Sequence, residues 1–530
     1  MQRMTWLWSS AALVLAGCPA TGGTDAGVDW WKDRVFYEVF VRSFADSNGD
    51  GTGDLQGLLA KLDYLNDGDP STTSDLGVDA LWLMPVFPAS SYHGYDVTDY
   101  KAISFAYGSL TDFDQLLAAA HQRGMKVILD FTPNHTSTQH PWFQDSVAQG
   151  THRDWYVWQP TDPGWQRSTD RAALWHSASS GYYYGYFTGG MPDLNWRNAD
   201  VEAAMLDAMR FWLGRGVDGF RFDAVRYLVE SSTGEVTDQP ETHAVSKRIR
   251  AALEASHPGT LLLAEAWGNF TTVGAYWGGG DEYHLAFAFD LAQAMIASLT
   301  GARGDDVINC IARMESLGID RAFDAPFLTN HDIARVMRQL GGDAAAARLA
   351  AATLLALPGT PFIYYGEELG MQGGGGADDQ EKRTPMRWNG AKPTYGFTTA
   401  SSTWDGLPEE SAGVDVETQR ADPQSLWQRY RKSISVRHSN PALSLGSTSR
   451  PRVQAANNGV MALLRSKDSS RVLFVANFGA TASGAFTVTS TGSPVVLDQE
   501  GLAGDPTSDG ATVTVPGLGP RGFAFISVGQ

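Results

Sequence analysis

Four short segments of this chain share one form, in which an apolar run gives way to polar residues with at least one carboxylate. They span residues 130–135, 219–226, 264–267 and 329–332. This form is typical of the C-terminal end of a buried strand. A (β/α)8 barrel brings the C-terminal ends of its strands to one face, and its active site lies there. The four segments therefore predict a barrel that aims several carboxylates at a common point.

Strand and helix patterns alternate along the chain from about residue 33, which predicts a parallel sheet covered by helices. Eight runs have the apolar character of strands: residues 35–41, 80–85, 126–131, 219–222, 261–265, 287–290, 325–328 and 361–365. Helical patterns occupy residues 55–65, 113–123, 201–215, 242–256, 343–357 and 425–438. Eight strands with intervening helices are the number that a closed (β/α)8 barrel requires.

Two parts of the chain break this alternation. Residues 136–195 are rich in Trp, Tyr, Gly and Pro and have no clear period, which indicates a small inserted domain that leans over the site. Residues 441–530 are rich in Val, Thr, Ser and Gly, with frequent turn signals, and predict an all-β sandwich. The predicted fold class is therefore α/β: a TIM barrel (residues 29–135 and 196–440), an insertion after strand three and a C-terminal sandwich.

The first 28 residues form a targeting segment and not part of the fold. Leu15-Ala16-Gly17-Cys18 resembles a bacterial lipobox, in which signal peptidase cuts before the cysteine and the thiol receives a diacylglycerol. Residues 1–17 are then the signal peptide, Cys18 is the lipidated residue and residues 18–28 are a tether. Because no Asp follows Cys18, the outer membrane is favoured if the cell is Gram-negative. The alternative is a plain secretory signal that contains a cysteine.

The net charge of −19 argues against nucleic acid as a partner, because phosphate binding needs basic patches. A strongly negative protein suits a neutral substrate. We expect the protein to contact the membrane only through its lipid anchor. Three converging acids, without a Cys/His metal cluster or a nucleophilic Ser motif, indicate chemistry on a glycosidic bond.

Each of the three acids has a role that follows from its neighbours. Asp223 is the expected nucleophile, because Arg221 lies on the same strand face and is expected to lower its pKa. Glu265 lies among apolar residues, which raise the pKa of a carboxyl and suit an acid/base. Asp332 can stabilise positive charge that develops at the anomeric carbon. The alternatives are a structural ion pair for Asp223, a helix-start position for Glu265 and a helix N-cap for Asp332.

These segments resemble the four sequence regions of the α-amylase superfamily, glycoside hydrolase family 13, in the same order. The gaps also fit, with 93 residues from Asp130 to Asp223, 42 to Glu265 and 67 to Asp332. The resemblance implies that Asp223 is the nucleophile, Glu265 the general acid/base and Asp332 the transition-state stabiliser. It also implies a substrate-binding group in which Arg221, His135 and His331 hold the sugar at the cleaved position. Tyr95 would be the platform under that sugar, with His93 beside it, and Asp130 would be a supporting residue at the end of strand three.

Two motifs bear on the branch of the family. Residues 191–195 (Met-Pro-Asp-Leu-Asn) resemble the intermediate subfamily between oligo-1,6-glucosidases and neopullulanases. Tyr92 stands where exo-acting α-glucosidases usually place an Asp, which favours an open cleft and an α-amylase that cleaves internal α-1,4 bonds of starch, glycogen and maltooligosaccharides. The protein is expected to be a monomer. The alternatives are an exo-acting α-glucosidase or oligo-1,6-glucosidase, a neopullulanase-type transglycosylating enzyme and a glycan-binding surface lipoprotein. Binding proteins of this last kind usually lose one or more of the three acids. All three are present in this chain, which favours an enzyme.

The segment 46–54 spaces oxygen-bearing side chains at every second residue, with glycines between them, and resembles part of an EF-hand loop. The related loop of the family binds Ca²⁺. The resemblance implies that the ligands here are the side chains of Asp46, Asn48, Asp50 and Asp54 and the carbonyl of Thr52. The alternative is an Asx-rich turn without metal. No full ligand set is evident for a second calcium near Asn134.

The lipobox yields a direct prediction about the mature protein. The mass of its N-terminal fragment should correspond to a diacylated Cys18, and globomycin should prevent the shift to that mass. A mature N-terminus at any other residue would contradict the lipid anchor.

Overall fold

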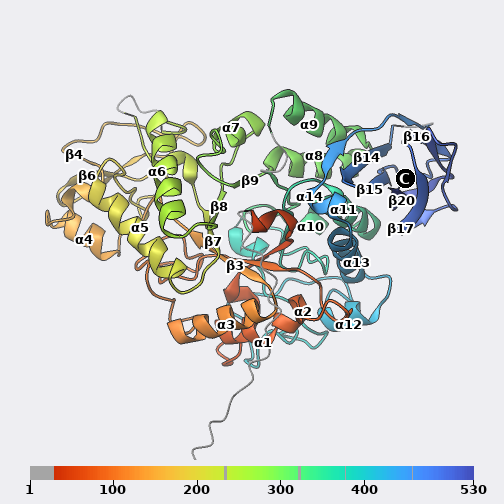
Figure 1. Ribbon diagram of the computed structural model, residues 1–530. Helices are drawn as coiled ribbons and strands as arrows, with labels where there is room; N and C mark the ends of the chain where they lie inside the picture. The colour runs from red at the N-terminus through yellow and green to blue at the C-terminus, as the bar shows by residue number, and fades with distance from the viewer. Residues whose placement is uncertain (1–28, 232–235, 320–323, 377, 456–457, 530) are drawn as a thin grey trace, which may run out of the picture.

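The computed structural model of the protein describes five stretches of the chain, which are residues 29–231, 236–319, 324–376, 378–455 and 458–529 (Figure 1). The predicted signal peptide, Cys18 and the tether lie outside the described residues. Within the described part, no helix has both the length and the apolar character needed to cross a bilayer.

Eight parallel strands form the central sheet, as predicted. They are β1 (Phe36–Val39), β2 (Ala80–Leu83), β3 (Lys126–Phe131), β7 (Gly219–Phe222), β8 (Leu261–Ala264), β9 (Leu285–Phe287), β10 (Asp324–Ala325) and β11 (Phe362–Tyr364). Their order in the sheet is β10-β9-β8-β7-β3-β2-β1-β11. An isolated parallel bridge between Phe327, two residues after β10, and Phe362 on β11 connects the two edges of the sheet, which is therefore nearly closed into a barrel.

The sixth and seventh strands begin earlier than the sequence indicated. Strand six is β9, and residue 289 already begins helix α8 (Phe289–Gly301). Phe287 and Phe289 are both buried, which imitates strand alternation, but they lie on either side of a strand-to-helix junction. Strand seven is β10 and ends before Pro326, which has no N–H to donate to a ladder.

Helices cover the outside of the barrel (Figure 1). They are α1 (Leu55–Ala60), α2 (Leu62–Leu65), α3 (Leu110–Gln122), α5 (Ala199–Leu213), α6 (Pro240–Ser256), α7 (Phe270–Ala275), α8, α9 (Asp305–Ser316), α10 (Val336–Gln339), α11 (Ala344–Ala356), α12 (Val416–Ala421), α13 (Leu426–Ser439) and α14 (Pro441–Leu445). The Ala-rich α11 is buried almost all round, because it packs against α8, α13 and the C-terminal strand β20. Small side chains allow this close approach on several sides.

The segment between β3 and α5 forms a separate small unit. It contains α4 (Pro141–Val147) and a three-stranded antiparallel sheet of β4 (Trp158–Gln159), β6 (Gly181–Tyr184) and β5 (Trp175–Ala178). A bridge between His135 and Asp193 ties its two ends together, and a second bridge joins Tyr156, inside the unit, to Leu194. This connection keeps the insertion next to the C-terminal end of β3.

The C-terminal region forms two antiparallel sheets around a second apolar cluster, in agreement with the predicted sandwich. One sheet consists of β12 (Ser447–Ser449), β14 (Val460–Lys467), β15 (Ser470–Asn477), β20 (Leu518–Gly529) and β17 (Ser493–Leu502). The other consists of β13 (Val453–Gln454), β16 (Phe486–Thr489), β19 (Thr512–Val515) and β18 (Thr507–Ser508). The sandwich and the inserted unit lie at opposite ends of the barrel (Figure 1).

Candidate active site

A single buried arginine joins the carboxylates at the top of the barrel. Arg221 on β7 is in register with Asp130 on β3, so both side chains point into the barrel. Its Nη1 donates hydrogen bonds of 2.8 Å to Asp130 Oδ1 and to Asp223 Oδ1. Its Nη2 lies 3.4 Å from Glu265 Oε1. The Arg221 side chain has no exposed surface, so its charge is compensated inside the protein.

The turn after β7 places Glu265 beside Asp223. The backbone N–H of Asp223 donates to the carbonyl of Phe131 on β3, which extends the strand pairing by one residue. Ala224 follows in the left-handed conformation, with a φ of 54°, and its N–H donates to Glu265 Oε2 at 2.9 Å. The strained turn therefore positions the acid that follows the neighbouring strand β8.

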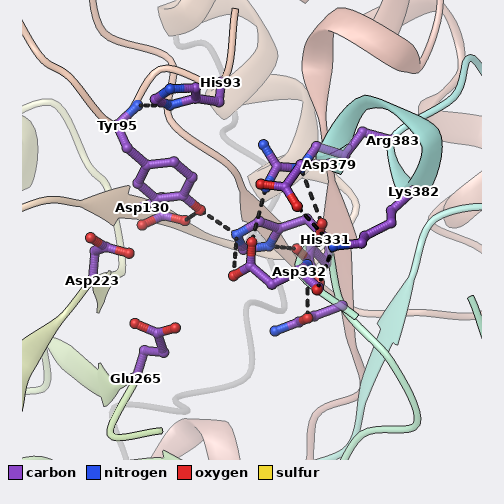
Figure 2. A network of polar contacts seen from close by, with 12 residues as sticks. His93, Tyr95, Asp130, Asp223, Glu265, His331, Asp332, Asp379, Lys382 and Arg383 are labelled. Carbon is purple, nitrogen blue, oxygen red and sulfur yellow. Dashed lines mark hydrogen bonds and ion pairs between the residues drawn. The ribbon is translucent and has the colours of Figure 1, made fainter. Parts of the chain in front are cut away.

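Asp332 lies on the opposite side of the site from Asp223 and Glu265, as Figure 2 shows. Its Oδ1 accepts a hydrogen bond of 2.9 Å from Arg383 Nη2, and its Oδ2 lies 3.1 Å from His331 Nε2. Burial opposes the charge of Asp332, but His331 and Arg383 outweigh it and hold the pKa of the carboxyl below its ordinary value. Asp332 is therefore an ionised carboxylate at neutral pH.

Glu265 is in the opposite state. Burial, together with the nearby charges of Asp223 and Asp332, raises the pKa of Glu265 to about 8 against the effect of Arg221. The carboxyl is therefore protonated at neutral pH and can donate a proton. Carboxyls whose environments separate their pKa values are typical of an acid and its partner in catalysis.

The expected effect of Arg221 on Asp223 is only partly right. Burial raises the pKa of Asp223 above its ordinary value, and Arg221 reduces this shift without reversing it. The predicted lowering of the pKa by Arg221 is therefore present, but desolvation of the buried carboxylate outweighs it, so the net shift is upward. Asp223 nevertheless makes a closer contact with Arg221 than Glu265 does, at 2.8 Å compared with 3.4 Å.

Three stacked rings lie beside the acids. The ring centroids of Tyr95 and His331 are 5.5 Å apart, with 17° between the planes, and those of His93 and Tyr95 are 5.9 Å apart. Tyr95 Oη donates to Asp130 Oδ2 at 2.9 Å (Figure 2). A flat aromatic surface whose rings are fixed by hydrogen bonds suits the C–H face of a sugar ring.

His135 begins the inserted segment and is also part of the site. Its ring lies 5.2 Å from that of Phe187, and burial lowers its pKa to about 3, so the imidazole is neutral. Within the described part of the chain, its buried Nε2 has no hydrogen-bond partner. The ring is therefore able to bond to a bound molecule. The structure thus brings the nine predicted catalytic and sugar-binding residues to the C-terminal face of the barrel.

Two further residues contact this group of site residues, and neither of them was predicted from the sequence. Glu38 on β1 lies with its Oε1 2.6 Å from His331 Nδ1. Arg383, which follows β11 in the chain, holds Asp332 and donates to the carbonyl of His331. The sequence does contain a sign that Glu38 is functional, because it is the only charged residue in the apolar run Phe36–Val39 and a buried charge needs a partner.

The predicted calcium loop forms consecutive turns in which side-chain oxygens accept from backbone N–H groups. Asp46 Oδ1 accepts from the N–H groups of Asn48 and Gly49. Asn48 Oδ1 accepts from the N–H of Asp50, and Asp50 Oδ1 accepts from the N–H of Thr52. The carboxylate of Asp54 instead caps helix α1 through the N–H of Gly57. Over the described ranges, no three His, Cys, Asp or Glu side chains are grouped as a metal site.

The comparisons with known proteins agree with this geometry. Residues 38–446 match the family model "Alpha amylase, catalytic domain". The chain is 36% identical over 456 residues to Alpha-amylase 3 of Dictyoglomus thermophilum, which covers 84% of this chain and 85% of that protein. It is 35% identical over 506 residues to the trehalose synthase/amylase TreS of Mycobacterium tuberculosis, covering 84% and 82%.

A solved structure is similar over most of the length. The alpha-amylase from H. orenii superposes with a TM-score of 0.81 at 36% identity, covering 94% of this chain and 99% of that one. These relatives are named for different activities, so the comparisons establish the family and the fold but not the substrate.

The raised pKa of Glu265 predicts how stability depends on pH. Its folded-state pKa is about 8 compared with an ordinary 4.5, so between these values the folded chain holds a proton that the unfolded chain releases. The stabilisation from this proton is complete below about pH 4.5 and is lost as the pH rises to about 8. Glu265→Gln cannot ionise and should therefore gain stability relative to the original protein over this window, by at least about 1 kcal/mol.

Scanning calorimetry between about pH 5 and pH 9 measures this difference in melting temperature. Glu409→Gln is the matched control, because this carboxylate is 84% exposed and its replacement should give the same small difference at every pH. A constant difference for Glu265→Gln as well would contradict the protonated state.

Proposed function

The chain belongs to the alpha-amylase catalytic-domain family, glycoside hydrolase family 13, and on that premise we propose that it hydrolyses internal α-1,4-glucosidic bonds of starch, glycogen and maltooligosaccharides. We propose a double displacement that retains the anomeric configuration. The observation that carries this proposal is the grouping of Asp223, Glu265 and Asp332, in which Glu265 is a protonated acid and Asp332 an ionised carboxylate.

The first displacement uses all three acids. The protonated Glu265 donates its proton to the glycosidic oxygen while the carboxylate of Asp223 attacks the anomeric carbon, so the C–O bond to the leaving sugar breaks as the bond to Asp223 forms. The ionised Asp332 stabilises the positive charge that develops on the ring. Its low pKa supports this role, because a carboxylate must remain charged to act electrostatically.

The second displacement reverses the roles of acid and base. Glu265, now ionised, removes a proton from water as the oxygen attacks the anomeric carbon and Asp223 leaves. A sugar hydroxyl in place of water would give transfer instead of hydrolysis. The relative with trehalose synthase in its name makes transfer the second candidate for this step.

The stacked rings and the unpartnered imidazole support a sugar position between the acids. The Tyr95 ring is held in place by His93 and His331, and we propose that this aromatic group contacts the C–H groups of a hexose. The Nε2 of His135 is buried and available for a hydroxyl group. Bound in this way, the anomeric carbon would lie between Asp223 and Asp332.

The surroundings of Tyr92 support endo-acting cleavage. Its ring stacks on Trp404 with 5.4 Å between centroids, and the Arg383 guanidinium lies 5.9 Å from its centre. An aromatic pair at this position supplies no carboxylate for the hydroxyl groups of a terminal glucose. It instead offers surface along which a longer glucan can continue.

A product time course on soluble starch and maltoheptaose tests this assignment. Endo-acting hydrolysis should remove the iodine colour early and release mixed maltooligosaccharides. Asp223→Asn should reduce kcat by at least about 10⁴-fold while glucan binding is retained, because the nucleophile is lost and the contact surface is kept. Unchanged activity of this variant would refute the role of Asp223. Glucose as the sole product, with persistent iodine colour, would refute endo-acting cleavage.

We also propose that the loop of residues 46–54 binds Ca²⁺. Its donors are all oxygen atoms, which is the chemistry that this cation requires, and Gly49 and Gly51 adopt the positive φ values that its tight turns need. The cation would be held by Asp46, Asn48, Asp50, Asp54 and the carbonyl of Thr52, and it would stabilise the loop without taking part in bond cleavage.

Chelation tests the calcium proposal. Removal of divalent cations should lower the melting temperature by about 5 °C, and added Ca²⁺ should restore it, because a ligand that binds only the folded state stabilises it. Asp50→Asn should abolish this response. Asp69→Asn removes a carboxylate from a similar exposed turn, in which it accepts from Ser71, and should leave the response intact. A melting temperature that ignores chelation would contradict the site.

A further inference from the structure

One residue of the site has no part in the mechanism above. Glu38 lies on β1, on the far side of His331 from Asp332. We propose that Glu38 is a positioning residue for the reaction, which keeps His331 as a doubly protonated imidazolium and through it orients Asp332 and Tyr95. This inference rests on the proposed function, because it assigns Glu38 a part in that same site.

The position of Glu38 in the barrel makes a charge there costly unless it is paired. The residue is 1% exposed and lies in register with Trp82 on β2 and Tyr364 on β11. Phe36, two residues earlier on the same face, stacks on Phe362 at 4.5 Å, so Glu38 lies directly above an apolar layer. A carboxylate so placed is tolerated only with a charged or strongly bonded partner. His331, at 2.6 Å, is that partner.

The hydrogen bonds around His331 determine its protonation state. Its Nε2 lies 3.1 Å from Asp332 Oδ2 and 2.6 Å from Tyr95 Oη. The single proton of Tyr95 is donated to Asp130, so toward His331 the hydroxyl can only accept. Nδ1 faces the carboxylate of Glu38 on the other side. Both ring nitrogens therefore face oxygen atoms, and an ionised Glu38 pairs with a ring that carries a proton on each nitrogen.

Several charged or titratable groups surround this imidazolium, from every strand that packs against it. They are Glu38 on β1, Tyr95 after β2, Asp130 on β3, Arg221 and Asp223 at the end of β7, Asp332 after β10 and Arg383 after β11. Burial opposes the charge of His331, but Asp332 and Glu38 raise its pKa to about 9. Burial also raises the pKa of Glu38, and His331 opposes that shift. Glu38 and Asp332 are the two carboxylates in direct contact with the ring.

The consequence for catalysis follows from this pairing. Without the charge of Glu38, His331 would lose its proton at a lower pH. Asp332 would then lose one of its two cationic partners, and Tyr95 would lose the N–H that its hydroxyl accepts. The effect on turnover should therefore appear as the pH rises, because at low pH the remaining carboxylate keeps the ring protonated.

Glu38→Gln tests this role, since glutamine keeps an oxygen acceptor at the same place and removes the charge. Relative to the original protein, its kcat on maltoheptaose should fall by less than about threefold at about pH 6 and by at least about tenfold at about pH 8.5, with KM little changed. Glu38→Asp, which retains the charge, should recover the original pH dependence.

Glu282→Gln is the matched control. Glu282 is also buried and lies 3.0 Å from the Nδ1 of a histidine, His243, and among the described residues none of its hydrogen bonds or ion pairs reaches the acids of the site. The variant should show the same ratio to the original protein at both pH values. A loss in Glu38→Gln that is equal at both pH values would mean that Glu38 is only structural and would overturn the inference.

A second readout does not depend on turnover. The chain has 11 histidines, and ¹⁵N-histidine spectra, assigned with His331→Gln, follow the protonation of His331 directly. Its midpoint should move down by at least about one pH unit in Glu38→Gln. An unchanged midpoint would show that Glu38 is the protonated partner and would refute the proposal. If the original protein cleaves no glucan while the midpoint still moves, the proposed substrate is wrong and the pairing stands.

Discussion

The buried guanidinium of Arg221 is the interaction on which the rest of the site depends. It bonds to Asp130 and Asp223 and lies near Glu265, so it joins residues from three neighbouring strands. Five carboxyl groups, including those of Glu38 and Asp332, could not be buried this close together without cations between them. Arg221, Arg383 and His331 supply those cations, and their unequal distribution leaves one acid protonated and another ionised.

The apolar interior of the barrel is the second constraint. Below the acids, Trp82, Phe287 and Phe362 contact one another at centroid distances of 5.2 to 6.2 Å, and Trp82 also contacts His331 from below. This layer excludes water from one side of the site. Desolvation is accordingly the largest influence on the pKa of Glu265 and Asp223. The same aromatic core that stabilises the barrel therefore prepares its acids.

Most of the framework was predictable from local patterns. Strand periodicity located eight strands, and the end of each acidic segment marked the face on which the site forms. The boundaries of strands six and seven were wrong, because Phe287 and Phe289 are buried by different elements and Pro326 ends the ladder. Glu38 was missed, although a charge inside an apolar strand is a recognisable signal, because its partner His331 lies 293 residues away.

The sequence by itself determined which acids face the site and in what order they follow the strands, because strand alternation and barrel topology assign a face to each residue. Only the tertiary structure decided how these acids are charged. The pKa of Asp223 depends on burial as well as on Arg221, and that of Asp332 depends on Arg383, which lies 51 residues further along the chain. Desolvation and ion pairing act through space, and neither can be obtained from the spacing of residues along the chain.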